Sequence, residues 1–77
     1  MEVRDGVRKF SLAMERKLRA NDFKGGWKDC TLAFLEGRMK EELLEYLESS
    51  GDVDELPDIA NFCMMVWTRR TGTGTYK

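Results

Sequence analysis

The chain has 77 residues, of which 42% are apolar and 35% are charged, and its net charge is −1. A single domain of this length removes only about 60% of its unfolded surface from water, so we expect a thin core that a metal or a partner chain completes. The small net charge provides no electrostatic footprint for a long phosphate backbone, which disfavours nucleic-acid binding. Histidine is absent, which removes the usual general base and most zinc sites and leaves carboxylates to carry any catalysis.

The cysteines and the hydropathy pattern indicate the compartment. Cys30 and Cys63 lie far apart, and the chain has neither an apolar N-terminal segment nor an apolar stretch long enough to span a membrane. We therefore predict a cytoplasmic protein with no membrane partner, whose reduced thiols are both small core residues.

The first predicted helix runs from Val3 to Leu18. Its apolar residues recur every three or four positions, which is typical of one stripe of an amphipathic helix. The members of this stripe are Val3, Val7, Phe10, Met14 and Leu18. A loop is predicted over residues 21–27, where Gly25 and Gly26 provide backbone freedom.

The second predicted helix runs from about Asp29 to about Ser49. Asp29 is a suitable N-cap or first-turn acid, and Gly37 is a tolerated but costly residue within the helix. The sequence Ser49-Ser50-Gly51-Asp52 then ends the helix.

The third predicted helix begins near Asp52 or Asp54 and ends near Arg70. If Asp54 is the N-cap, Pro57 falls in the first turn, where its missing N–H costs little, whereas capping by Asp52 predicts a distorted helix. Residues 71–77 have no apolar periodicity, and we expect them to form a flexible tail.

The short connection between the second and third helices favours an antiparallel hairpin. The predicted fold is therefore all-α, a helical hairpin plus an N-terminal helix in a single domain of residues 1–70. We expect this unit to assemble into a four-helix-bundle-like homo-oligomer, a dimer or a tetramer, because one chain buries so little surface.

Acidic residues fall on the packing face of the second helix. At about 100° per residue from Leu35, Met39 lies near +40°, Tyr46 near +20° and Glu42 near −20°. Glu42 is thus inside the apolar sector, and Glu45, at roughly −80°, borders it.

The third helix repeats this arrangement. Relative to Ile59, Cys63 lies near +40°, Val66 near −20° and Glu55 near −40°, while Asp58 lies at the margin near −100°. Each helix therefore places one acid within its predicted packing face and one beside it.

An antiparallel hairpin would gather these four acids near its closed end. Like charges about 4 Å apart repel by roughly 4 kcal/mol at an effective dielectric constant of 20, so such a group needs a counter-ion. Oxygen ligands select a hard cation, which predicts Mg²⁺ with Mn²⁺ as its substitute. Spacing alone leaves the alternative open, in which the acids are solvated or serve only to cap helices.

Two short motifs carry a resemblance to a known family. They are Glu41-Glu42-Leu43-Leu44-Glu45 on the second helix and Glu55-Leu56-Pro57-Asp58 on the third. This pattern, EExxE followed by ExxD, resembles the MazG-like all-α nucleoside triphosphate pyrophosphohydrolase superfamily. The similarity extends over residues 21–67, through NDFKGGW before the second helix and DIANFCMM after the second motif.

The resemblance implies Mg²⁺-dependent cleavage between the α and β phosphates of a nucleoside triphosphate, giving a monophosphate and pyrophosphate. It implies that Glu42, Glu45, Glu55 and Asp58 hold the metal and that Glu41 assists as an outer-sphere or base residue. Glu41 and Glu42 are thus the predicted catalytic residues. Attack by water without a covalent intermediate is compatible with the lack of histidine.

Three further residues are candidates for substrate binding. Lys24 could reach a phosphate as a point charge, although a solvated loop lysine fits equally well. Trp27 could stack on a base, whereas a core anchor is the commoner role of such a residue. Asn61 could donate a hydrogen bond to substrate, or it could be exposed.

The chain also departs from the family pattern. Only nine residues separate Glu45 from Glu55, and Pro57 occupies a position where helix formers are usual. The chain ends soon after the third helix, so Arg69 and Arg70, or a neighbouring subunit, would have to provide the basic substrate-binding groups. The competing hypotheses are a non-catalytic helical nucleotide-binding or protein-interaction module and a purely structural helical protein.

Overall fold

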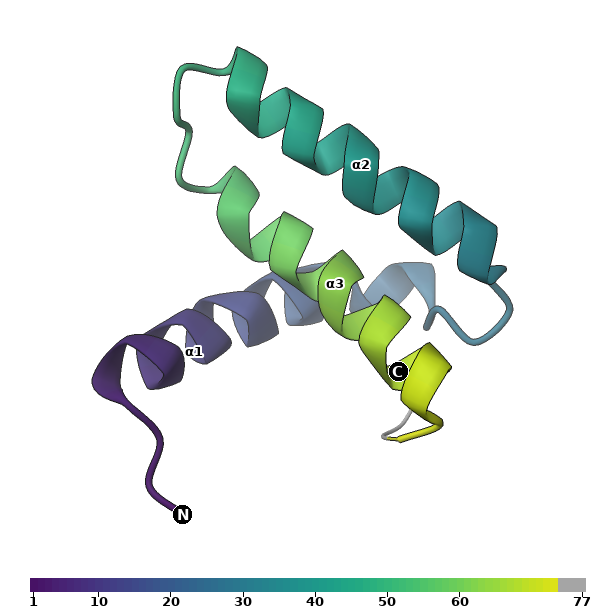
Figure 1. The fold of residues 1–77 in the computed structure, drawn as a ribbon, viewed down its shortest axis with the longest axis horizontal. Coiled ribbons are helices and arrows are strands. Elements are labelled where there is room, and N and C mark those ends of the chain that lie inside the picture. The colour runs from purple at the N-terminus through teal and green to yellow at the C-terminus, as the bar shows by residue number, and fades with distance from the viewer. Residues whose placement is uncertain (74–77) are drawn as a thin grey trace.

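The computed structural model describes residues 1–73, and its α helices are α1, α2 and α3 (Figure 1). Their bounds, with those of one short 3₁₀ helix, η1, are Asp5–Ala20 for α1, Asp22–Lys24 for η1, Leu32–Glu48 for α2 and Glu55–Thr71 for α3. The described residues form no strand, which confirms the predicted all-α class. Within them, no helix combines the length and the apolar character needed to cross a membrane.

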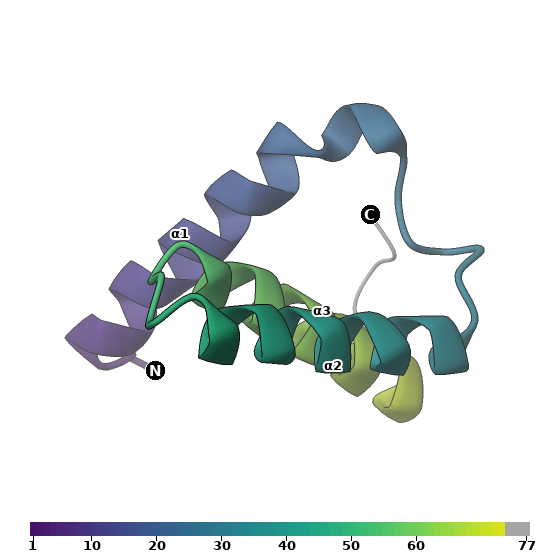
Figure 2. The ribbon, with the colours of Figure 1, turned by 90° about the horizontal axis from the view of Figure 1, so that it is seen from above.

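The three helices are arranged around α3. α2 and α3 lie side by side and antiparallel, which confirms the predicted hairpin (Figure 1). α1 crosses the other side of α3 and, over the described residues, does not pack against α2 (Figure 2). α3 therefore needs two packing faces, one for each neighbour.

α2 begins later than its sequence predicts. Its N-cap is Thr31, whose side chain accepts a hydrogen bond from the backbone N–H of Phe34 at 3.0 Å. Asp29 lies in the preceding turn, so the prediction that it caps or opens the helix was wrong. After Glu48 the chain reverses through Ser50 and Gly51, both with positive φ, 64° and 93° respectively.

The start of α3 agrees with the predicted alternative in which Asp54 is the N-cap. Asp54 directly precedes the helix, and Pro57 is its third residue, where no intrahelical hydrogen bond is lost. The helix continues through Thr71 and ends at Gly72, which adopts the left-handed conformation with φ of 69°. The prediction that Thr71 belongs to a flexible tail was therefore wrong, and residues 74–77 of the predicted tail lie outside the described part of the chain.

The core is as thin as the length of the chain predicts. Within residues 1–73, the buried apolar side chains are Trp27, Leu35 and Met65, which form the core cluster, and Pro57 in the first turn of α3. Leu35 is 1% exposed, and Glu42 is buried on the same face of α2, as the periodicity predicts. The interior thus contains a carboxylate beside very little apolar surface.

The packing face of α3 differs from its prediction. Cys63 is exposed, so its assignment to the core was wrong, while Cys30 is half-buried. The most buried positions of the helix are Pro57, Asn61, Met65 and Thr68. Two of these are polar, and an apolar stripe cannot reveal a packing face built partly from polar residues.

Arg69 fixes the loop that leads into α2. Its guanidinium donates to the backbone oxygens of Cys30 at 2.8 Å and Trp27 at 3.1 Å. It also lies 5.8 Å from the centroid of the Trp27 ring. The neighbouring Arg70 instead pairs with Glu36 of α2 at 2.9 Å. Both arginines therefore connect α3 to the segment of residues 27–36.

α1 begins at Asp5, two residues after its predicted start, so Val3 precedes the helix, and the predicted apolar stripe is covered along only half its length. Met14 and Leu18 are half-buried, whereas Val3, Val7 and Phe10 are exposed by 51%, 55% and 41%. α1 contains no buried residue at all. Its N-terminal half therefore presents uncovered apolar side chains to the surroundings.

Candidate functional site

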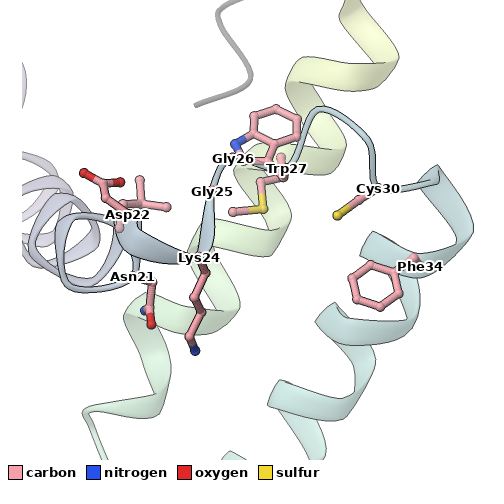
Figure 3. A pocket seen from close by; sticks show the side chains of 10 residues that line it. Asn21, Asp22, Lys24, Gly25, Gly26, Trp27, Cys30 and Phe34 are labelled. Carbon is pink, nitrogen blue, oxygen red and sulfur yellow. The ribbon is translucent and has the colours of Figure 1, made fainter.

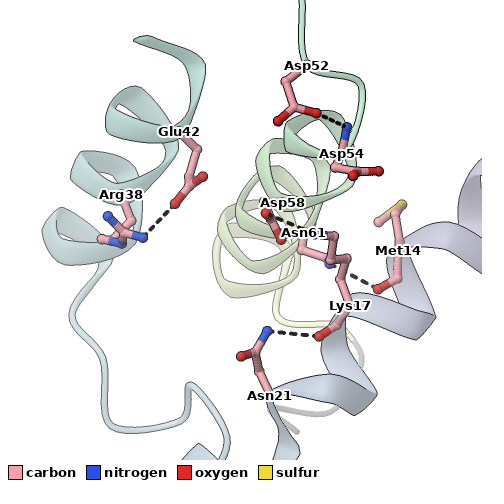
Figure 4. Close-up of polar contacts among 9 residues, drawn as sticks. All are labelled: Met14, Lys17, Asn21, Arg38, Glu42, Asp52, Asp54, Asp58 and Asn61. Carbon is pink, nitrogen blue, oxygen red and sulfur yellow. Dashed lines mark hydrogen bonds and ion pairs between the residues drawn. The ribbon is translucent and has the colours of Figure 1, made fainter. Parts of the chain in front are cut away.

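Glu42 is the most buried carboxylate in the described structure, with a relative exposure of 7%. It is buried because it lies on the face of α2 that packs against α3, two helical turns after Leu35. Its Oε1 accepts a hydrogen bond from Nη2 of Arg38, one turn earlier, at 2.6 Å (Figure 4). The helix pairing therefore holds a negative charge between α2 and α3.

Two more glutamates converge on Glu42. One carboxylate oxygen from each of Glu42, Glu45 and Glu55 lies within 4.8 Å of the others. Glu45 is one turn further along α2, and Glu55 is the first residue of α3, so the closed end of the hairpin brings them together. We call these three residues the carboxylate cluster; Glu42 is buried, Glu55 half-buried and Glu45 exposed.

The surroundings of Glu42 oppose its ionisation. Burial raises the pKa of its carboxyl group, and the charges of Glu45 and Asp58 and contact with Glu55 act in the same direction. Arg38 lowers this pKa but does not cancel the upward shift. The cluster thus carries more negative than positive charge, and a bound proton or cation would relieve the repulsion within it.

This shift predicts a pH dependence of stability. Because Glu42 is harder to ionise in the folded chain, the folded state holds the extra proton between the unfolded and folded pKa values, and the free energy of unfolding falls as pH rises through that window. We expect the gain in melting temperature from Glu42→Gln, measured by circular dichroism with chelator present, to grow as the pH rises above the ordinary pKa of a glutamate. A constant or shrinking gain would contradict the assignment.

Asp58 lies apart from the carboxylate cluster. It is half-buried on α3, and its Oδ2 is 3.7 Å from Nζ of Lys17 on α1 (Figure 4). It remains close enough to influence the charge of Glu42. Three of the four predicted metal ligands are therefore brought together, and the fourth is paired with a lysine.

Glu41 is exposed on α2, and its Oε2 accepts a hydrogen bond from Nη1 of Arg38. The guanidinium of Arg38 thus holds Glu41 and Glu42 at once, and it lies 5.3 Å from the ring centroid of Phe62 on α3. Sequence reasoning missed Arg38. Its spacing, three and four residues before the two glutamates, was the signal that could have found it.

Asn61 is buried at 4% exposure and faces α1. Its Nδ2 donates to the backbone oxygen of Met14 at 3.0 Å, and within the described residues its Oδ1 has no hydrogen-bond partner (Figure 4). The alternative that Asn61 is exposed was wrong. In this structure it connects α3 to α1.

Lys24 and Trp27 line a cavity of about 320 Å³ beside the loop before α2 (Figure 3). Trp27 is 5% exposed and belongs to the core with Leu35 and Met65, which agrees with the core-anchor alternative. Lys24 lies 5.7 Å from the centroid of the Phe23 ring. We call this space the Trp27 cavity; its other lining residues are Leu18, Asn21, Asp22, Gly25, Gly26, Cys30, Phe34 and Met65.

The Trp27 cavity and the carboxylate cluster lie toward opposite ends of the α2–α3 hairpin. Phe34 lines the cavity, Arg38 follows one turn later and Glu42 one turn after that. At 1.5 Å per residue, Phe34 and Glu42 are about 12 Å apart along the helix axis. Arg38 thus occupies the middle of this path.

The comparisons with known proteins returned nothing: the chain matches no protein-family model, no curated protein and no solved structure.

Proposed function

We propose that this protein is a Mg²⁺-dependent nucleoside triphosphate pyrophosphohydrolase that cleaves the bond between the α and β phosphates to give a monophosphate and pyrophosphate. The observation that carries the proposal is the carboxylate cluster, in which Glu42 is buried at the closed end of the hairpin. The motif resemblance to the MazG-like superfamily supports the same reaction.

The donor set suits Mg²⁺. All three groups offer hard carboxylate oxygens, and these lie within 4.8 Å of one another. Oxygens on opposite sides of an octahedral Mg²⁺ are about 4.2 Å apart, so small side-chain movements suffice to bring the three onto one ion. Asp58 becomes a fourth ligand if its carboxylate leaves the ion pair with Lys17 and binds the cation. Mn²⁺ accepts the same ligands and serves as the substitute.

The proposed reaction gives each acidic residue of the site a role. Bound Mg²⁺ would polarise the phosphoryl oxygens and neutralise their charge. Glu42, Glu45 and Glu55 would hold it, and Glu41, exposed beside them, would accept a proton from the attacking water. This arrangement needs no histidine and no covalent intermediate.

The Trp27 cavity is the proposed site of the nucleoside. Its walls combine aromatic and aliphatic side chains with the ammonium group of Lys24 and the amide of Asn21. Apolar pockets with a few polar groups are the usual form of small-molecule sites. The path of about 12 Å from Phe34 to Glu42 suits a molecule whose base and triphosphate occupy opposite ends.

The experiment is a pyrophosphate-release assay on a panel of ordinary and modified nucleoside triphosphates, with Mg²⁺, Mn²⁺ or chelator. We expect monophosphate and pyrophosphate in equal amounts from at least one substrate, and no product with chelator. Orthophosphate as the product would contradict cleavage at the α–β bond. Silence with both metals at high protein concentration would count against an enzyme altogether.

A non-catalytic nucleotide-binding module is the second candidate. The pairing of Asp58 with Lys17 favours it, because it leaves three acids in the cluster. In that case triphosphates raise the melting temperature without being consumed. Since the proposed reaction needs triphosphates and Mg²⁺, we also propose that the protein works in the cytoplasm.

The proposed assembly is a homo-oligomer, a dimer or a tetramer with a four-helix-bundle-like core. A second copy would cover Val3, which precedes α1, and Val7 and Phe10 of α1, all of which the chain by itself leaves exposed. We expect Phe10→Glu to convert the oligomer to a monomer, as measured by sedimentation equilibrium. Phe23→Glu, in η1 and 81% exposed, is the control that should leave the mass unchanged. A monomeric wild-type protein would overturn the proposed assembly.

A further inference from the structure

We infer that Arg38 is an exchangeable internal counter-ion, which holds Glu42 when no divalent cation is bound and binds the substrate's phosphates when the cation takes Glu42. The inference rests on the proposed function and adds to it a phosphate-binding residue.

Arg38 meets the cluster from within its own helix. One terminal nitrogen of its guanidinium donates to Glu41 and the other to Glu42, at 2.6 Å for Glu42. The planar guanidinium of arginine can give two N–H groups either to two separate acceptors, as here, or to two oxygens of one carboxylate or phosphate. The geometry that now serves two carboxylates is therefore suited to the oxygens of a phosphate.

Phe62 keeps the guanidinium between the helices. Its ring centroid is 5.3 Å from Cζ of Arg38, and this contact comes from α3 rather than α2. A cation over an aromatic face is held without using its hydrogen-bond donors. If the carboxylates turn toward a metal ion, Arg38 retains this support while its N–H groups become available.

Access and position agree with this role. The Arg38 side chain is 33% exposed, so a ligand can reach it, whereas Glu42 behind it is 9% exposed by the same measure. Arg38 also lies one helical turn from Phe34 of the Trp27 cavity and one turn from Glu42. A triphosphate that extends from the cavity to the cluster therefore passes its guanidinium.

The two roles predict effects of opposite sign. In the free protein, Arg38 competes with a cation for Glu42 and repels it, so its removal should strengthen metal binding. With substrate present, removal deletes a charged phosphate ligand and should weaken binding. If Arg38 had only a structural role, its removal would not strengthen metal binding.

The test uses Mn²⁺ alone and inorganic tripolyphosphate in excess Mg²⁺, both measured by isothermal titration calorimetry on the full chain. For Arg38→Gln we expect Mn²⁺ to bind about tenfold more tightly and tripolyphosphate at least about tenfold more weakly. Arg19→Gln is the matched control, because its surface pair with Glu15 lies on α1 and outside the cluster, and both affinities should stay at the wild-type values.

Two further variants keep the inference testable if Arg38→Gln folds poorly. Arg38→Lys retains the charge but not the fork, and should leave Mn²⁺ affinity near wild type while weakening tripolyphosphate binding. Phe62→Leu removes only the aromatic support and should weaken tripolyphosphate binding without strengthening Mn²⁺ binding.

The outcomes separate the two proposals. If wild type binds Mn²⁺ and releases pyrophosphate but Arg38→Gln shows unchanged or weaker Mn²⁺ binding, the role of Arg38 is overturned and the proposed function stands. If wild type neither binds Mn²⁺ nor releases pyrophosphate, both proposals fall.

Discussion

Glu42→Gln is expected to abolish the proposed hydrolysis and, in the absence of metal, to make the protein more stable. Removing a charged ligand from the metal should lower kcat/KM by about a thousandfold or more, since the ion contributes several kcal/mol to the transition state. The measurement is pyrophosphate release at saturating Mg²⁺.

The stability gain in the metal-free protein follows from charge. Glu42 repels Glu45 and Glu55, whose oxygens lie within 4.8 Å, by roughly 3 kcal/mol per pair at an effective dielectric constant of 20, before solvent screening and the attraction of Arg38 reduce the sum. We expect a net gain of about 1 kcal/mol, which corresponds to a rise in melting temperature of roughly 4–8 °C.

Glu48→Gln provides the matched control for both measurements. Glu48 is the last residue of α2, is exposed and lies outside the carboxylate cluster. Its substitution should leave hydrolysis at the wild-type rate and change stability by less than about 0.5 kcal/mol. A Glu42→Gln protein with wild-type activity, or one less stable than wild type without metal, would contradict the assignment of Glu42.

Arg69→Met is expected to lower the free energy of unfolding by about 2–4 kcal/mol. It removes the charged hydrogen bonds to the backbone oxygens of Cys30 and Trp27 and the cation–π contact with the Trp27 ring. In so small a domain this is a large part of the total stability. The check is urea unfolding followed by circular dichroism at 222 nm as the usual helix signal, with the melting temperature as a second readout.

Arg70→Met is the control for this variant. Arg70 is the next residue of α3, and its pair with Glu36 joins two largely exposed side chains, so its loss should cost at most about 1 kcal/mol. Equal effects of the two substitutions would show that the loop before α2 does not depend on Arg69. Arg69→Lys should be more stable than Arg69→Met but less stable than wild type, because lysine lacks the planar guanidinium.

Local sequence patterns were sufficient for the outline of the fold. The apolar spacing of α1 and α2, the break at Ser49-Ser50-Gly51-Asp52 and the position of Pro57 each depend on a few neighbouring residues, and each predicted its element. The burial of Glu42 was predictable for the same reason, because a residue two turns from Leu35 must share its face.

The departures occur where a side chain meets a partner distant in the sequence. Cys63 was predicted to lie in the core as a small thiol close in angle to Ile59, whereas α3 packs on two helices and leaves it exposed. Thr31 rather than Asp29 caps α2 because the loop before it, fixed by Arg69, delays the first helical turn. Neither effect leaves a periodic signal.

The amino-acid sequence by itself determined the helices, the hairpin and the acidic character of its closed end, since each follows from side chains within one or two turns of one another. Only the tertiary structure decided that Glu55 joins Glu42 while Asp58 turns to Lys17, and that Arg38 and Phe62 meet between the helices. The physical reason is that the angle and spacing between helices decide which side chains touch, and these depend on how the whole chain shares its small apolar surface.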